Sequence, residues 1–210
     1  MQDREAGYDL LKVAREAIRV EADAVRGLEE SIDGSFLQAI EIIKACSGRV
    51  VVTGVGKSGH VGKKIAATLA STGTPAFFVH SDEALHGDLG MITHQDVVVA
   101  VTNSGETPEI LAMLATLKKV GAKIIAITGK KDSTLGKSSD LVLLAAVKRE
   151  ADHLNLAPTA SSTAALALGD ALAIALAVER GFSRGDFGLY HPGGALGRVL
   201  KKEVEPEEDR

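Results

Sequence analysis

The stretch from Asp96 to Glu109, DVVVAVTNSGETPE, constrains the fold most, because a strand, a polar loop and a helix follow one another directly. Val97 to Val101 is a continuous run of β-branched and apolar residues, which is typical of a parallel strand covered on both faces. Pro108 stands at the expected first helical position, and apolar residues follow it at helical spacing. The stretch therefore predicts an α/β unit with the loop at the carboxyl end of its strand.

The loop itself is rich in groups that bind anions. Thr102, Asn103, Ser104 and Thr107 surround Gly105, whose missing Cβ allows a close approach of the backbone. Free N–H groups and the positive end of the helix dipole would face any ligand there, so phosphate is the natural candidate. The alternative is a capped helix start without a ligand, because the same residue types are ordinary capping residues.

An earlier segment repeats this layout. Residues 49–53 form an expected strand, and the loop Gly54-Val55-Gly56-Lys57-Ser58-Gly59 leads into a helix. The glycine spacing matches a dinucleotide-binding fingerprint, with Asp82 or Glu83 near the usual position of a ribose-binding acid. A nucleoside-triphosphate loop would need a glycine where Val51 stands. Both nucleotide readings are therefore weaker than that of a phosphate-binding loop.

Strands that alternate with helices at short intervals predict a mainly parallel sheet. The expected strands are residues 49–53, 75–79, 96–101, 123–128 and 140–144, and the expected flanking helices include residues 8–26, 35–46 and 164–179. We expect a three-layer α/β/α sandwich of flavodoxin-like type, with ligands at the carboxyl ends of the strands. Residues 1–48 would supply helices that pack on the core or on another subunit, residues 49–200 the main domain, and residues 201–210 a charged tail.

Composition limits the function. The chain has 210 residues, a formal charge of −4, 3% aromatic residues and no Trp, which argues against a general nucleic-acid-binding protein. Cys46 is the only cysteine, which suits a reducing cytoplasm. The N-terminal stretch has no apolar core of signal-peptide type, and we expect no segment long and apolar enough to span a bilayer. The prediction is a soluble, cytoplasmic protein without a membrane partner.

Several longer motifs occur together in one order. They are GVGKSGHVGKKIAATLASTGTPAFFVH, EALHGDLG, NSGETPEI, LAPTASSTAALALGDALA and FGLYHPGGALGR. Over about residues 35–200 the sequence resembles the sugar isomerase (SIS) family of phosphosugar-binding domains, and within it the arabinose 5-phosphate isomerases. The resemblance implies interconversion of D-ribulose 5-phosphate and D-arabinose 5-phosphate by a homotetramer, the entry to 3-deoxy-D-manno-octulosonate (Kdo) for lipopolysaccharide or capsule. Isomerisation through an enediol obliges no cofactor.

The resemblance also implies the site residues. Its catalytic residues fall on Lys57, Glu109, Glu150, His86 and His191. We expect Glu150 to be the base, His191 or His86 to open the sugar ring, and Lys57 to stabilise developing negative charge. Each has a structural alternative: a solvated lysine, a glutamate that favours a helix dipole, a surface acid, and hydrogen-bonded histidines.

The expected substrate-binding residues are Ser58, Gly73, Thr74, His86, Thr102, Asn103, Ser104 and Thr107. His80 matches a position where the family binds inhibitory zinc, whereas Glu106 is expected to cap or pack. After His80 the sequence has Ser81-Asp82, where the family usually has small residues or proline. Many members continue into a tandem pair of cystathionine β-synthase (CBS) domains, and we expect that pair to be absent here.

Two other functions remain open at this stage. The phosphate loop binds the phosphate group whatever the number of carbons in the sugar, so the substrate could be another phosphosugar. A non-catalytic regulator that binds a phosphosugar would need the same loop but no base or acids. The set formed by Lys57, Glu150, His86 and His191 distinguishes an isomerase from such a regulator.

Overall fold

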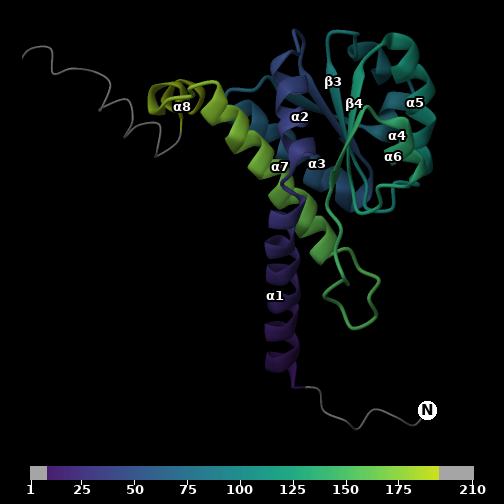
Figure 1. Ribbon diagram of the computed structural model, residues 1–210, viewed down its shortest axis with the longest axis vertical. Coiled ribbons are helices and arrows are strands. Elements are labelled where there is room, and N and C mark those ends of the chain that lie inside the picture. Colours follow the sequence, from purple (N-terminus) through teal and green to yellow (C-terminus); the bar gives the residue numbers. More distant parts are fainter. Residues whose placement is uncertain (1–8, 194–210) are drawn as a thin grey trace, which may run out of the picture.

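A five-stranded parallel sheet lies at the centre of the computed structural model, which describes residues 9–193 (Figure 1). The strands are β1 (Val50–Gly54), β2 (Ala76–His80), β3 (Val97–Val101), β4 (Lys123–Thr128) and β5 (Leu141–Leu144). Their order is β2-β1-β3-β4-β5, and all neighbouring pairs are parallel. This is the flavodoxin-like order, so the predicted fold class is confirmed.

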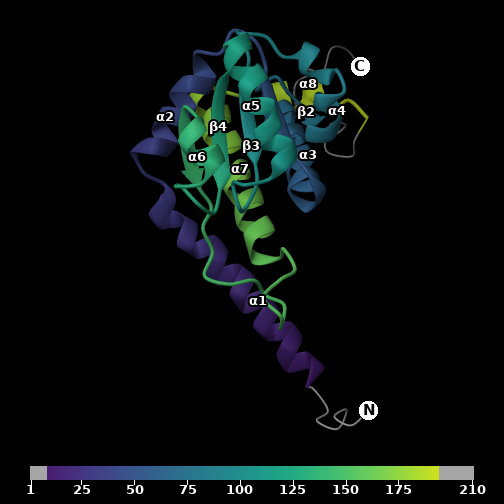
Figure 2. The ribbon, with the colours of Figure 1, turned by 90° about the vertical axis from the view of Figure 1, so that its right-hand side faces the viewer.

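Helices cover both faces of the sheet (Figure 2). One layer contains α2 (Gly34–Lys44), α3 (Gly56–Ser71) and α7 (Ala160–Glu179), and the other contains α4 (Ser81–Leu85), α5 (Pro108–Val120) and α6 (Thr134–Ser138). Alternate residues of β3 face the two layers, so that Val97 and Val99 join one core and Val98 joins the other. All five residues of β3 are buried, which explains its continuous apolar sequence.

Each end of every predicted strand lies within one residue of the observed end, and β4 has the predicted bounds. Three features were not predicted. The polar stretch after β2 forms α4 and the 3₁₀ helix η2 (Asp88–Met91), the short helix α6 lies between β4 and β5, and a helix α8 (Arg184–Tyr190) follows α7. The proposed tail, residues 201–210, lies outside the described residues, as do residues 1–8 and 194–200.

Helix α1 (Leu10–Gly27) forms within the predicted helix of residues 8–26 and is followed by the 3₁₀ helix η1 (Leu28–Ser31). It runs along the start of α7 and projects beyond the body of the domain (Figure 1). None of its residues is buried, and the side chains of Leu10 and Ile18 are 74% and 70% exposed. The apolar stripe of α1 is therefore only partly covered by its own chain.

Helix α7 begins at Ala160, slightly earlier than predicted, and packs against α1, α2 and α3. The expectation that no segment is long and apolar enough to span a membrane is wrong, because α7 meets that criterion by length and composition. Half of this helix is nevertheless buried inside the domain, and the core helix of a soluble protein passes the same test. Ile174 and Val178, near its end, are exposed, so α7 is not buried on every side.

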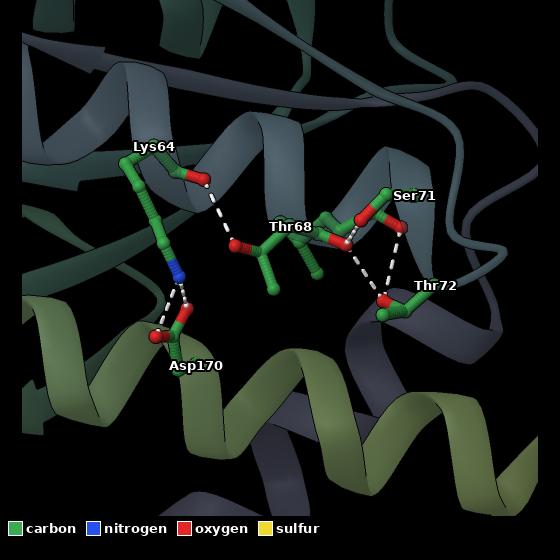
Figure 3. A network of polar contacts seen from close by, with 6 residues as sticks. Lys64, Thr68, Ser71, Thr72 and Asp170 are labelled. Carbon is green, nitrogen blue, oxygen red and sulfur yellow. Dashed lines mark hydrogen bonds and ion pairs between the residues drawn. The ribbon is translucent and has the colours of Figure 1, made fainter. Parts of the chain in front are cut away.

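Helices α3 and α7 pack closely against each other. Lys64 Nζ lies 2.6 Å from both carboxylate oxygens of Asp170 (Figure 3). Both side chains are substantially exposed, so the pair contributes at most about 1 kcal/mol. A Cβ on Gly169 would lie 2.5 Å from Ile65, so the glycine allows the contact between the two helices. Apolar packing, rather than the ion pair, determines the position of α7 against α3.

Asp96 fixes the turn that leads into β3. Its Oδ1 accepts a hydrogen bond from the Arg49 N–H at 2.7 Å, and its Oδ2 accepts from the N–H and the hydroxyl of Thr93 at 2.7 and 2.9 Å. Burial raises the pKa of Asp96, but these hydrogen bonds outweigh it and hold the pKa below its usual value. The carboxylate therefore stabilises the fold only while it is ionised.

Because the folded-state pKa of Asp96 is lowered, its contribution is fully present above the unfolded pKa of about 3.9 and is lost as pH falls through the folded value. We expect Asp96→Asn to cost about 1–3 kcal/mol at pH 7, because an amide accepts fewer hydrogen bonds, and to flatten the loss of stability below about pH 4. Urea unfolding at several pH values measures both effects. Asp23→Asn, at an exposed helix position, is the control, and an unchanged acid slope in Asp96→Asn would contradict the assignment.

Candidate active site

Two polar loops meet at the carboxyl edge of the sheet. One follows β1 and the other follows β3, and these strands are neighbours, with Thr53 paired to Ala100. The strand order reverses between β1 and β3, and such switch points form a crevice outside the strand ends. The fold therefore places the two predicted phosphate-binding loops side by side.

The first loop opens α3. Gly56 has φ of +55°, and the helix has no side-chain cap, so its first N–H groups are left for a ligand or water. Lys57 is exposed and Ser58 is half-buried. A Cβ on Gly59 would lie 3.0 Å from the carbonyl oxygen of Gly54, so these two glycines serve the close packing of helix on strand.

The second loop opens α5, which has Pro108 at its first position as predicted. The hydroxyls of Thr102 and Thr107 lie 2.6 Å apart, and Ser104 Oγ accepts a hydrogen bond from the Glu106 N–H at 3.1 Å. Helix α5 also lacks a side-chain cap, so the N–H groups that follow Pro108 in its first turn are left for a ligand or water. The geometry suits an anion held by hydroxyls and two helix ends.

Gly105 has φ of +67°, and a Cβ there would overlap the side chain of Ser133. The space that the glycine leaves is thus used by the neighbouring loop. Glu106 Oε1 accepts a hydrogen bond from the Thr134 N–H at 2.8 Å at the start of α6, so its predicted role as a cap is confirmed. These two contacts hold the anion loop against the segment after β4.

A small cavity of about 50 Å³ lies between the two loops and the start of α7. Its polar lining comes from Ser58, Asn103, Ser161 and Ser162, and its apolar lining includes Val61, Val101, Ile127 and Ala145. The Ser161 hydroxyl is buried and has no hydrogen-bond partner among the described residues. The cavity therefore offers a free hydroxyl close to both predicted loops.

Sequence reasoning missed Ser161 and Ser162 as lining residues. The available signal was the group of four hydroxyl residues, Thr159, Ser161, Ser162 and Thr163, that follows Pro158. Gly129, which also lines the cavity, follows β4, the next strand of the sheet, and its N–H bonds the Asn103 carbonyl at 3.0 Å. Polar groups after successive parallel strands share one edge, so this position was open to prediction as well.

Glu150 is buried, with 9% of its surface exposed, which contradicts the alternative of a surface acid. Its Oε2 accepts hydrogen bonds from Thr159 N and Oγ1 and from Ser161 N at 2.8, 3.1 and 3.1 Å. Burial raises the pKa of Glu150, but the hydrogen-bond donors of Ser161 and Thr159 outweigh it and hold the pKa below its usual value. The Ser161 hydroxyl lies near this carboxylate without being aligned for a hydrogen bond.

The other predicted groups at this edge are less enclosed. Glu109 is half-buried in the first turn of α5, where its charge favours the helix dipole. Lys57 makes no hydrogen bond or ion pair within residues 9–193, and His86 is exposed at the end of α4. His80 Nδ1 accepts a hydrogen bond from the Asp82 N–H at 3.3 Å. In the described part of the chain no three His, Cys, Asp or Glu side chains gather as a metal site, so zinc at His80 stays a prediction.

Three predicted residues lie elsewhere. Gly73 and Thr74 form the turn between α3 and β2 at the opposite, amino edge of the sheet, where Gly73 faces Phe182. His191 follows α8, and its Nδ1 lies 2.8 Å from the carbonyl oxygen of Phe187, on whose ring it stacks. Helix α7 spans about 30 Å between the cavity and this region, and Figure 1 shows α8 at its far end. A single chain does not bring these residues to the crevice.

The chain is similar to known proteins of one family. A model of the SIS domain family matches residues 43–175. Arabinose 5-phosphate isomerase KdsD of Pseudomonas aeruginosa is 56% identical over 197 residues, which cover 94% of this chain and 60% of that protein. KdsD of Escherichia coli K12 is 50% identical over 198 residues, with the same coverage. The chain thus spans about 60% of the length of these relatives.

Solved structures share the fold. The structure of E. coli CFT073 c3406 in complex with arabinose 5-phosphate superposes with a TM-score of 0.85 and 49% sequence identity, and covers 89% of this chain and 100% of that one. The whole length of that chain therefore corresponds to the fold described above.

Proposed function

The chain belongs to the SIS domain family, and from this premise we propose that it is an aldose–ketose isomerase that interconverts D-ribulose 5-phosphate and D-arabinose 5-phosphate. The observation that carries the proposal is the crevice at the switch point, where Ser58 and Asn103 lie beside two helix N-termini without side-chain caps. Ser161 also lines this cavity, and its backbone N–H bonds the buried, ionised Glu150. The similarity of the chain to KdsD proteins supports the choice of the sugar.

In this proposal the phosphate is held by the loop hydroxyls of Ser58, Ser104 and Thr107 and by the N–H groups that open α3 and α5. Glu150 removes a proton from C1 of the ketose, and the electron pair moves into a C1–C2 double bond as the carbonyl oxygen at C2 takes up a proton. The enediol then loses the proton of the C1 oxygen, and C2 accepts a proton to give the aldose. Lys57 stabilises negative charge on the oxygens, and Glu109 is a second acid or base.

His191, Gly73 and Thr74 lie far from the crevice of their own chain, which suggests that another copy of the chain contributes them. We propose that a second copy of the chain places them beside the crevice, so that His191, or His86, opens the furanose ring. Self-association is supported by the exposed apolar side chains of α1, which include Leu10 and Ile18. A homotetramer is the assembly we expect.

The pathway and compartment follow from the same proposal. We assign the reaction to the first step of Kdo synthesis for lipopolysaccharide, as the KdsD names support, and we place the protein in the cytoplasm. The partners we expect are the sugar phosphate and further copies of the chain, because a charge of −4 and few aromatic residues do not favour nucleic acid. We expect the reaction to run without an added cofactor.

Proton NMR of the purified protein with D-ribulose 5-phosphate in deuterated water tests the activity. We expect anomeric signals of D-arabinose 5-phosphate to appear, with deuterium at the carbon beside the carbonyl, because the enediol exchanges its proton with solvent. Formation of a different aldose phosphate would keep the mechanism and replace the substrate. Binding of the sugar phosphate without turnover would favour the phosphosugar-binding regulator instead.

A further inference from the structure

The Thr159 side chain connects the carboxylate of Glu150 with the backbone of the next residue, Ala151. Its hydroxyl donates to Glu150 Oε2 at 3.1 Å and accepts a hydrogen bond from the N–H of Ala151 at 2.7 Å. The backbone N–H of Glu150 bonds the side chain of Asn155 at 2.7 Å, and Asn155 adopts a positive φ of 55°. The carboxylate is thus held relative to its own backbone across a loop of nine residues.

The two carboxylate oxygens of Glu150 differ in the hydrogen bonds that they accept. An ionised carboxylate can only accept hydrogen bonds, so the single proton of the Thr159 hydroxyl is directed to Glu150, while Thr159 Oγ1 accepts from Ala151. Oε2 receives three hydrogen bonds, which fill its lone-pair positions. Within residues 9–193 no aligned hydrogen bond reaches Oε1, although the Ser161 hydroxyl lies near the carboxylate. Oε1 is therefore the oxygen that is left open to take up a proton.

The charged groups around the loop do not compete for this carboxylate. They are Lys148 and Arg149 before it, Asp152 and His153 within it, and Glu16 and Glu21 of α1, whereas the first turn of α7 has no acid. Arg149 pairs with Glu16 at 2.7 Å, and Asp152 accepts from three backbone N–H groups of its own loop. Hydrogen bonds from the start of α7 are therefore what fixes Glu150.

We propose that Thr159 is a positioning residue that fixes the Glu150 carboxylate through Oε2 and leaves Oε1 as the oxygen that exchanges a proton with the substrate. This inference rests on the proposed isomerase function, because it needs Glu150 to be the base. It assigns a role to a residue that does not line the cavity and that was not among the predicted site residues.

Thr159→Val tests the proposal, because valine has a similar shape and keeps the backbone N–H at position 159 but removes the hydroxyl. Losing a donor to the charged form raises the pKa of Glu150. We expect the acid limb of the pH profile of kcat/KM to move up by about one pH unit, with a loss of about tenfold on the acid side. Carbon-13 NMR of the Glu150 carboxyl, assigned with Glu150→Gln, should report the same shift in the free protein.

Two variants control for general damage at the start of α7. Thr159→Ser keeps the hydroxyl and should restore the wild-type profile. Thr163→Val removes a hydroxyl that bonds Glu21 of α1 at 2.9 Å, and should leave both the limb and the carboxyl titration unchanged.

The outcomes separate this inference from the function on which it rests. A raised carboxyl titration in Thr159→Val without movement of the acid limb would overturn the positioning role, and so would an unchanged titration. If the wild-type protein turns over no sugar phosphate, the isomerase proposal fails, and Thr159 loses its catalytic role with it. In that case the carboxyl titration still reports whether Thr159 holds Glu150 ionised.

Discussion

Replacing Glu150 with glutamine is expected to lower kcat by about two to four orders of magnitude while the affinity for the sugar phosphate stays close to that of the wild type. The variant removes the group that accepts the substrate proton. Glutamine keeps one oxygen that can accept the hydrogen bonds of Thr159 N and Ser161 N, so the start of α7 should remain in place.

The effect is measured as the rate of isomerisation by NMR, with calorimetric binding of D-arabinose 5-phosphate to the inactive variant. Glu21→Gln is the matched control, because Glu21 also bonds the start of α7, through Thr163, but lies on α1. Unchanged turnover in Glu150→Gln would remove Glu150 from the mechanism. Glu109, in the first turn of α5, would then be the remaining candidate for the base.

Gly105→Ala is expected to lower the free energy of unfolding by about 2–4 kcal/mol and to weaken phosphate binding. The residue has φ of +67°, and the added Cβ would overlap Ser133 Oγ and Cβ. Ser133 cannot move away cheaply, because its hydroxyl accepts the Gly136 N–H at 3.1 Å as the cap of α6. Urea unfolding and titration with inorganic phosphate measure the two effects.

Gly181→Ala separates the steric cost from the backbone cost. Gly181 has nearly the same φ, +66°, but a Cβ there meets nothing within 4 Å, so we expect a loss of only about 1–2 kcal/mol. Adding Ser133→Gly to Gly105→Ala should recover part of the steric loss, because the next neighbour, Thr128 Oγ1, is 3.2 Å away. Equal losses for the two single alanine variants would show that overlap with Ser133 is not the cause.

Local sequence patterns were enough to predict the sheet. A fully buried parallel strand needs an unbroken apolar run, and VVVAV of β3 is such a run with all of its residues buried. A helix that starts with proline after a hydroxyl-rich loop is also a local signal, and α5 begins at Pro108. The two predicted phosphate loops share one edge because parallel strands direct all their carboxyl ends the same way.

Weaker local signals explain the elements that were missed. Helix α4 has only five residues, and polar side chains dominate the stretch that contains it, so no apolar period was visible. Helix α8 is capped by Ser183 and Asp186, a short signal without a long amphipathic face. Helix α7 passes a membrane-span test by length and composition, because composition alone does not distinguish a bilayer from the neighbouring helices that cover half of it.

The sequence by itself determined which residues form the buried strands and the polar loops after them, because both depend on neighbouring residues in the chain. The tertiary structure alone decided how those residues are grouped. Glu150 became a buried, ionised group because the loop to Thr159 folds back on it, and such a contact depends on the whole path of the chain. His191 was separated from it because α7 is rigid and about 30 Å long, so the ends of this helix cannot meet within one chain.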